Sequence, residues 1–165
     1  MNAEVRMRIS QAMKSKIHWR STPILLSAIF ALAPLARGAD PWTPSQIIEP
    51  AALAKQLANA KNPPMIIQVG FLTLYKQSHI PGAEYCGPTS KPEGLEQLKK
   101  CVEKVSRSRE IVIYCGCCPW KNCPNVRPGF EELSRLGFKN LRVLNIPQTF
   151  GQDWVKKGYP VVSSD

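Results

Sequence analysis

Hydrophobic and polar positions along the chain predict strands that alternate with helices. Largely apolar runs at 65–70 (MIIQVG), 111–115 (IVIYC) and 141–146 (LRVLNI) are typical of strands whose two faces are both buried. A shorter strand is predicted from Ala83 to Cys86, after the turn formed by residues 79–82 (HIPG). Runs of this kind indicate a sheet enclosed by other elements.

Between these runs the pattern changes to helical spacing. A helix of about ten residues is predicted to begin at Glu49-Pro50, because proline is tolerated in the first turn. A second helix is predicted from Pro92 to Val105, with an apolar stripe formed by Leu95, Leu98, Cys101, Val102 and Val105. A third is predicted over 126–136, and a short final helix is predicted around Trp154. Asn125 is the expected N-cap of the third helix. Strands alternating with helices predict an α/β domain with a parallel sheet covered on both faces.

Residues 1–39 are typical of an export signal rather than of a folded domain. A basic lead precedes an apolar run from Pro23 to Ala36 that is too short for a permanent membrane helix. Small residues then predict cleavage after Gly38 or Ala39. The prediction is a periplasmic or secreted domain, residues 40–165, without membrane attachment. An uncleaved anchor or a buried core helix is the alternative.

The leader also accounts for half of the chain's net charge. The chain has 22 basic and 12 acidic residues, of which residues 1–39 contain six and one, so the remainder carries +5. No basic cluster alternates with aromatic residues, so nucleic-acid binding is not expected. A charge of this size suits small anionic substrates.

All six cysteines follow the leader. An even number in an exported chain suggests a disulfide framework. A domain of this size does not require one, however, and the adjacent Cys117 and Cys118 cannot easily pair. A framework explains Cys86 and Cys101 at most. Since Cys101 lies on the apolar stripe of its predicted helix, we interpret it as a core thiol.

The other four cysteines, Cys115, Cys117, Cys118 and Cys123, lie in one predicted loop, YCGCCPWKNCPNV (114–126). Several interpretations are open. Four soft ligands could bind zinc or cuprous copper, although the Cys-x2-Cys pairs of a zinc finger are missing. A disulfide between Cys118 and Cys123 could brace the loop. The spacing from Cys115 to Cys118 also allows a dithiol–disulfide oxidoreductase. We predict no bound metal and no other cofactor.

The loop's position favours covalent chemistry at Cys115. This residue ends a predicted strand and opens the loop before a helix, where ligands of parallel α/β folds bind. Loop N–H groups and the helix N-terminus stabilise a thiolate there. Lys121 and Arg127 are predicted to lower the thiol pKa further and to bind an anionic sulfur donor. Gly116 and Trp120 are also expected at the substrate site.

Four segments in order resemble the rhodanese family of sulfurtransferases: SHIPGAEY (78–85), IVIYC (111–115), ELSRLGFKNLRVLNI (132–146) and DWVKKGYPV (153–161). The resemblance covers nearly all of residues 40–165. It implies a rhodanese-like domain with a central parallel sheet of about five strands and helices on both faces.

For function, the resemblance implies that Cys115 takes sulfur from a small anionic donor as a persulfide and passes it to a thiol or another acceptor. Cys117, Cys118 and Cys123 are then candidate resolving or structural thiols. An exported oxidoreductase or a Cys-rich Zn/Cu-binding module of the same fold remains the alternative.

Two departures from the family pattern concern the substrate. Gln68-Val69-Gly70 replaces the family's usual Asp-Val-Arg, which removes a charged pair near the site. Eleven residues separate Cys115 from Arg127, which makes the loop longer than usual. The chain is therefore not expected to enclose thiosulfate in the usual way.

Overall fold

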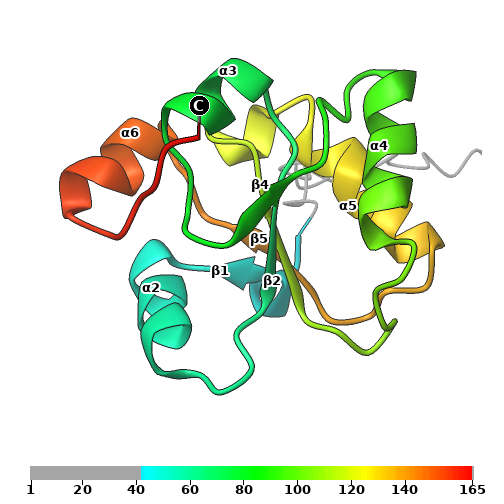
Figure 1. Ribbon diagram of the computed structural model, residues 1–165, viewed down its shortest axis with the longest axis horizontal. Coiled ribbons are helices and arrows are strands. Elements are labelled where there is room, and N and C mark those ends of the chain that lie inside the picture. The colour runs from blue at the N-terminus through cyan, green and yellow to red at the C-terminus, as the bar shows by residue number, and fades with distance from the viewer. Residues whose placement is uncertain (1–41, 165) are drawn as a thin grey trace, which may run out of the picture. The chain divides into compact units, whose positions relative to one another are not determined.

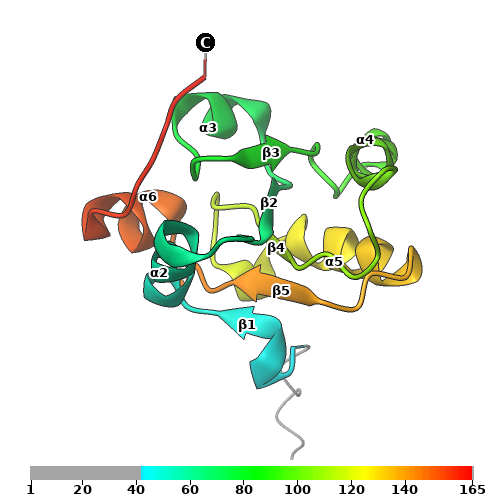
Figure 2. The same ribbon diagram turned by 60° about the horizontal axis from the view of Figure 1, so that its bottom comes forward.

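Five parallel strands form the centre of the domain (Figures 1 and 2). The computed structural model describes residues 42–164, so the predicted leader and its cleavage site lie outside the described residues. The sheet order is β1-β5-β4-β2-β3. The strands are β1 (Ile47–Ile48), β2 (Met65–Gln68), β3 (Ala83–Tyr85), β4 (Ile111–Tyr114) and β5 (Leu141–Leu144). The predicted fold class, a parallel α/β sheet of about five strands, is confirmed.

Helices cover both faces of this sheet. In Figure 1, α4 and α5 lie on one side of the strands, and α2 and α6 lie on the other. Two separate apolar clusters match these layers: one includes Leu98 and Phe130, and the other includes Leu53 and Trp154. The helices are α2 (Pro50–Asn59), α3 (Leu72–Gln77), α4 (Pro92–Val102), α5 (Val126–Arg135) and α6 (Phe150–Asp153). Short 3₁₀ turns occur at Pro44–Gln46, Trp120–Asn122 and Val155–Lys157.

The central strand shows why the apolar runs were informative. Every residue of β4 is buried, because β4 pairs with β2 on one side and β5 on the other, and helices cover its faces. Alternate residues enter the two clusters: Ile111 and Ile113 face α4 and α5, whereas Val112 and Tyr114 face α2 and α6. A strand enclosed in this way requires an uninterrupted apolar sequence.

The interpretation of Cys101 as a core thiol is wrong, because Cys101 forms a disulfide with Cys86. Cys86 follows β3 and is fully buried, and Cys101 lies on α4. Their Cα atoms are 6.1 Å apart, within the range that a disulfide spans. The apolar stripe correctly oriented Cys101 toward the sheet. The structure shows the alternative, a disulfide framework limited to Cys86 and Cys101.

Across residues 42–164, no helix combines the length and the apolar character needed to cross a membrane.

Candidate active site

The cysteine loop begins at the carboxyl end of β4. Cys115 directly follows Tyr114, and the loop continues to Asn125, where α5 begins. Gly116 has a φ of +85°, a conformation that L side chains rarely adopt. A Cβ atom there would also lie 2.8 Å from the Cβ of Phe150. Glycine therefore lets the chain turn sharply beside α6, and Cys115 stays at the strand end.

The sulfur atoms of the loop lie close together. Cys115 Sγ is 3.2 Å from Cys117 Sγ, which is 3.3 Å from Cys118 Sγ. Cys123 completes the group, since the ligand atoms of Cys115, Cys117 and Cys123 all lie within 4.8 Å of one another. All four thiols are free in this structure, so the bracing disulfide considered between Cys118 and Cys123 is not formed. We call these four side chains the thiol cluster.

Asn125 binds the thiol cluster instead of capping α5. It occupies the N-cap position as predicted, but its side chain makes no capping hydrogen bond. Its Nδ2 donates to Cys115 Sγ at 3.6 Å, and its Oδ1 accepts from the backbone N–H of Ser90 at 3.0 Å. Thr89 Oγ1 donates to the Asn125 carbonyl. This buried amide therefore fixes Cys115 relative to the loop before α4.

Gln68 and Gly70, which stand where the rhodanese pattern has a charged pair, form a compact uncharged contact with Cys115. The Gln68 side chain is buried; its Nε2 donates to the Cys115 carbonyl at 3.0 Å, and its Oε1 accepts from the Gly70 N–H at 3.2 Å. A Cβ atom on Gly70 would lie 2.8 Å from Cys115 Sγ. Residue 70 thus has no room for a larger side chain, and the Cys115 sulfur occupies that space.

The pKa shifts within the thiol cluster favour ionisation at Cys123. Its pKa is lowered to about 5, chiefly because the Cys115 thiol donates a hydrogen bond to it. Burial opposes this shift, whereas the backbone N–H groups of Asn125 and Val126, at the start of α5, support it. The same contact with Cys123, followed by burial, raises the pKa of Cys115 well above its usual range. Burial and Cys117 raise the pKa of Cys118 to about 12.

This distribution differs from the ionised Cys115 that strand position suggested. The N–H groups at the start of α5 contact Cys123 rather than Cys115. The pKa directions therefore favour a Cys115 thiol that donates a hydrogen bond to an ionised Cys123. Cys115 can still attack as a nucleophile when its proton passes to Cys123 at the same time as the new bond forms.

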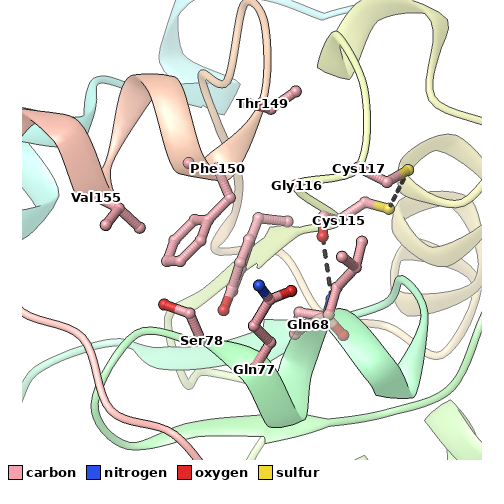
Figure 3. Close-up of a pocket in the computed structure, with 12 residues that line it drawn as sticks. Gln68, Gln77, Ser78, Cys115, Gly116, Cys117, Thr149, Phe150 and Val155 are labelled. Carbon is pink, nitrogen blue, oxygen red and sulfur yellow. Dashed lines mark hydrogen bonds between the residues drawn. The ribbon is translucent and has the colours of Figure 1, made fainter.

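A cavity of about 380 Å³ adjoins Cys115, Gly116 and Cys117 (Figure 3). Phe150 and Val155 lie on the opposite side from the sulfur atoms of Cys115 and Cys117. Gln68, Gln77 and Ser78 line the side next to α3. Cys115 and Cys117 are thus the two cysteines that line this ligand-sized space. Cys118 and Cys123 do not line this cavity.

The residues predicted to bind substrate do not all meet here. Gly116 lines the cavity, but Trp120, Lys121 and Arg127 do not. Trp120 is 5% exposed and packs in the cluster of α4 and α5, with its ring centroid 6.1 Å from that of Trp42. Lys121 and Arg127 are exposed and lie over the rings of Trp120 and Trp42. Their roles in substrate binding stay predictions.

Sequence reasoning missed several residues that shape the site. The sequence predicts Asn125 only as a helix N-cap, and it marks Gln68 only as the loss of a charged side chain. Ser78 and Phe150 line the cavity but carried no signal of their own. A short helix, α3, brings Ser78 to the cavity, and this helix was not predicted because Leu72 and Leu74 are exposed.

Three of these sulfurs could hold a soft metal ion. Cys115, Cys117 and Cys123 are close enough to share one, and Cys118 adjoins Cys117. Thiolates are ligands that Zn²⁺ and Cu⁺ prefer. The arrangement therefore fits the metal-binding alternative as well as covalent chemistry.

The fold and the site together define a parallel α/β domain with a cysteine at the end of its central strand. The rhodanese-like domain family matches residues 49–145, so this chain belongs to that family. No curated protein matches the chain.

Solved structures share the fold at low sequence identity. A protein of Bacillus halodurans has a TM-score of 0.58 and 19% identity, covering 73% of this chain and 78% of that one. The rhodanese-like domain of an Anabaena protein has a TM-score of 0.53 and 18% identity, covering 72% and 79%. A thiosulfate sulfurtransferase of Pseudomonas aeruginosa has a TM-score of 0.54 and 23% identity, covering 73% of this chain but 20% of that one. These likenesses establish the fold.

Proposed function

We propose that this protein is a sulfurtransferase in which Cys115 carries a persulfide. The observation that supports this most directly is the position of Cys115, which follows β4, lines the cavity and hydrogen bonds within the thiol cluster. Membership of the rhodanese-like family supports the reaction class. Fold alone does not define activity, so the proposal depends on this site.

The first step is attack by Cys115 on the outer sulfur of a donor. As the new S–S bond forms, the Cys115 proton passes to the Cys123 thiolate, which already accepts a hydrogen bond from it. The S–S bond within the donor breaks, and the remainder of the donor leaves with the electron pair and takes up a proton. Cys115 then carries one additional sulfur atom, and no external oxidant is consumed.

Cys117 is placed to act as a resolving thiol. Its sulfur is 3.2 Å from that of Cys115, and it also adjoins the cavity. Attack by Cys117 on the inner sulfur would form a Cys115–Cys117 disulfide and expel hydrosulfide. An external thiol entering the cavity would instead take the outer sulfur and restore the Cys115 thiol. The first route resembles an oxidoreductase and requires later reduction, whereas the second is a complete transfer.

Intact-mass spectrometry of variants in which one cysteine is replaced by serine tests the assignment of Cys115. After exposure to thiosulfate and to an organic persulfide, the wild-type protein should gain one sulfur atom with at least one donor. Cys115→Ser should not gain it. Cys117→Ser should gain it and retain it for longer, because a resolving thiol is missing. Persulfide on Cys115→Ser at the wild-type rate would contradict the proposal. Cys118→Ser serves as the control, because Cys118 does not line the cavity.

The long loop is proposed to serve this function by supplying thiols. We infer that it does not wrap a small anion, because its interior is filled by its own sulfurs and by Trp120. The N–H groups at the start of α5, which could bind an anionic donor, contact Cys123 instead. The enlarged loop thus supplies additional thiols rather than additional space.

We also propose that residues 1–39 direct export and are removed. The basic and apolar pattern of the leader supports this. The disulfide between Cys86 and Cys101 supports it independently, because disulfides persist in oxidising compartments. The N-terminal sequence of protein recovered from the periplasm or medium should begin after Gly38 or Ala39. A full-length chain recovered only with reduced Cys86 and Cys101 would contradict export.

Soft-metal binding is a second candidate, favoured by the proximity of the Cys115, Cys117 and Cys123 sulfurs. Metal analysis of protein purified without oxygen separates the two functions. Stoichiometric zinc or copper lost in Cys123→Ser would favour the metal function, whereas metal-free protein that accepts sulfur favours the transferase.

A further inference from the structure

The cavity beside Cys115 has no charged lining. None of the twelve described residues around it is Lys, Arg, Asp, Glu or His. Its polar groups are amides and hydroxyls, such as Gln77, Ser78 and Thr149. A dianion or a carboxylate that entered would lose water without gaining an opposite charge, which is costly. The cavity is therefore poorly suited to a small anionic donor.

Its size and walls instead suit an organic group. A volume of about 380 Å³ lies within the range of sites for small organic ligands. Tyr114 and Phe150, whose ring centroids are 5.4 Å apart, provide aromatic wall surface. Leu74 and Val155 add aliphatic surface and are 37% and 38% exposed, so the cavity also presents apolar side chains to solvent.

Ser78 supplies an unused polar contact in this cavity. Its Oγ is buried, and no group in the described part of the chain hydrogen bonds to it. Figure 3 shows the Ser78 side chain on the same side of the cavity as Gln77, facing Val155. A buried hydroxyl without a partner is unfavourable, and a bound molecule with a hydrogen-bonding group would satisfy it.

We propose that the sulfur donor is the persulfide of an uncharged, partly apolar organic thiol, R–S–SH, whose group R occupies this cavity. The inference rests on the proposed function and narrows its substrate class. It replaces the small anionic donor suggested by net charge and family resemblance. The terminal sulfur of the donor then faces Cys115, at the opposite end of the cavity from Val155.

The reaction balances without any further reagent. Cys115 forms a bond to the terminal sulfur, and the S–S bond of R–S–SH breaks. The organic sulfur leaves as a thiolate and takes up the proton that Cys115 released, which gives R–SH and the Cys115 persulfide. Because each step is reversible, the same cavity accepts R–SH when the sulfur moves in the opposite direction.

Two donors of matched reactivity and different charge test this proposal. Benzyl persulfide is uncharged in its organic group, whereas the persulfide of mercaptoacetic acid carries a carboxylate. Intact-mass spectrometry should show sulfur loading from the benzyl donor at least about tenfold faster, because a carboxylate finds no charged partner in the cavity. Equal rates, or faster loading from the carboxylate donor, would overturn the proposal.

Substitutions at the cavity provide the matched comparison. Val155→Lys places a cation at the cavity and should reverse or abolish the preference for the benzyl donor. Val161→Lys is the control, because Val161 is 39% exposed, nearly as Val155 is, but does not line the cavity. It should keep the wild-type preference. If both lysine variants behave alike, the selectivity does not come from this cavity and the proposal fails.

Binding without sulfur transfer separates this inference from the proposed function. Cys115→Ser should bind benzyl methyl sulfide, an unreactive analogue, and Val155→Lys should weaken that binding, as measured by calorimetry. If the analogue binds but no donor loads wild-type protein, the cavity assignment stands and the transferase function fails. If donors load the protein but the analogue does not bind, the function stands and the organic substrate class fails.

Discussion

Two side-chain amides position the Cys115 backbone and sulfur. Gln68 donates a hydrogen bond to the Cys115 carbonyl, and Asn125 donates one to its Sγ. The end of β2 and the start of α5 therefore both hold Cys115 in place. Gly70 leaves the space that the sulfur occupies. None of these three residues is charged. The site therefore relies on shape and on hydrogen bonds to keep Cys115 in place.

Gly70→Ala should displace the Cys115 sulfur. The added Cβ would lie 2.8 Å from Sγ and 2.9 Å from Gln68 Nε2, and neither neighbour is free to move. We expect a loss of about 1–3 kcal/mol in unfolding free energy, measured in urea, and slower alkylation of Cys115.

Gly82→Ala is the control for this change. Gly82 has a φ of +76°, so alanine is strained there too, but no atom lies within 4 Å of the added Cβ. It should lose about 1 kcal/mol and keep the wild-type reactivity of Cys115. Slower Cys115 alkylation in both variants would mean that general destabilisation, not contact with the sulfur, is responsible.

At the scale of elements, the sequence predicted most of the secondary structure. The long apolar runs correctly placed β2, β4 and β5, and helical spacing correctly placed α4 and α5, because burial dictates those patterns. The turn at residues 79–82 placed β3, and the first-turn proline placed the start of α2. Two elements were missed. β1 has two residues, and its pairing with β5 depends on distant contacts. α3 exposes several apolar side chains, so its pattern does not show an inward face.

The site was less predictable than the elements. Strand position correctly brought Cys115 to the sheet's carboxyl end, and crowding correctly suggested that the thiols interact. The lowered pKa of Cys123 could not be predicted, because it depends first on a hydrogen bond from the Cys115 thiol and then on contacts with the N–H groups of Asn125 and Val126. The cavity joins residues from β2, α3, β4 and α6, and no local pattern records that assembly.

The disulfide should be the main covalent support between β3 and α4. It closes a loop with a sequence separation of 15, for which the loss of chain entropy in the unfolded state is worth about 3 kcal/mol. The double variant Cys86→Ala/Cys101→Ala should lose about 2–4 kcal/mol in urea unfolding. Cys118→Ala, which breaks no disulfide, is the control. A loss below about 1 kcal/mol would show that packing alone fixes α4.

At the scale of the whole molecule, the exposed basic side chains lie apart from the cavity beside Cys115. The basic side chains Lys121 and Arg127 are exposed, whereas Cys115 is 3% exposed and adjoins an uncharged cavity. The lowered pKa of Cys123 favours a negative charge within the protein, beside Cys115. In the proposed mechanism, the thiol cluster activates Cys115 without help from a charged substrate. The account therefore depends on proton transfer between two cysteines.

The pH dependence of Cys115 alkylation by iodoacetamide, an uncharged reagent, tests this dependence most directly. Peptide mass spectrometry assigns the rate to Cys115. In the wild-type protein the rate should fall as pH drops through about 5, where Cys123 becomes protonated, and should change little from pH 6 to 8. In Cys123→Ser the contact that raises the Cys115 pKa most is lost together with the proton acceptor, but burial still raises that pKa, so the rate should be low at pH 6 and rise about tenfold per pH unit. The same rising profile in both proteins would contradict the account.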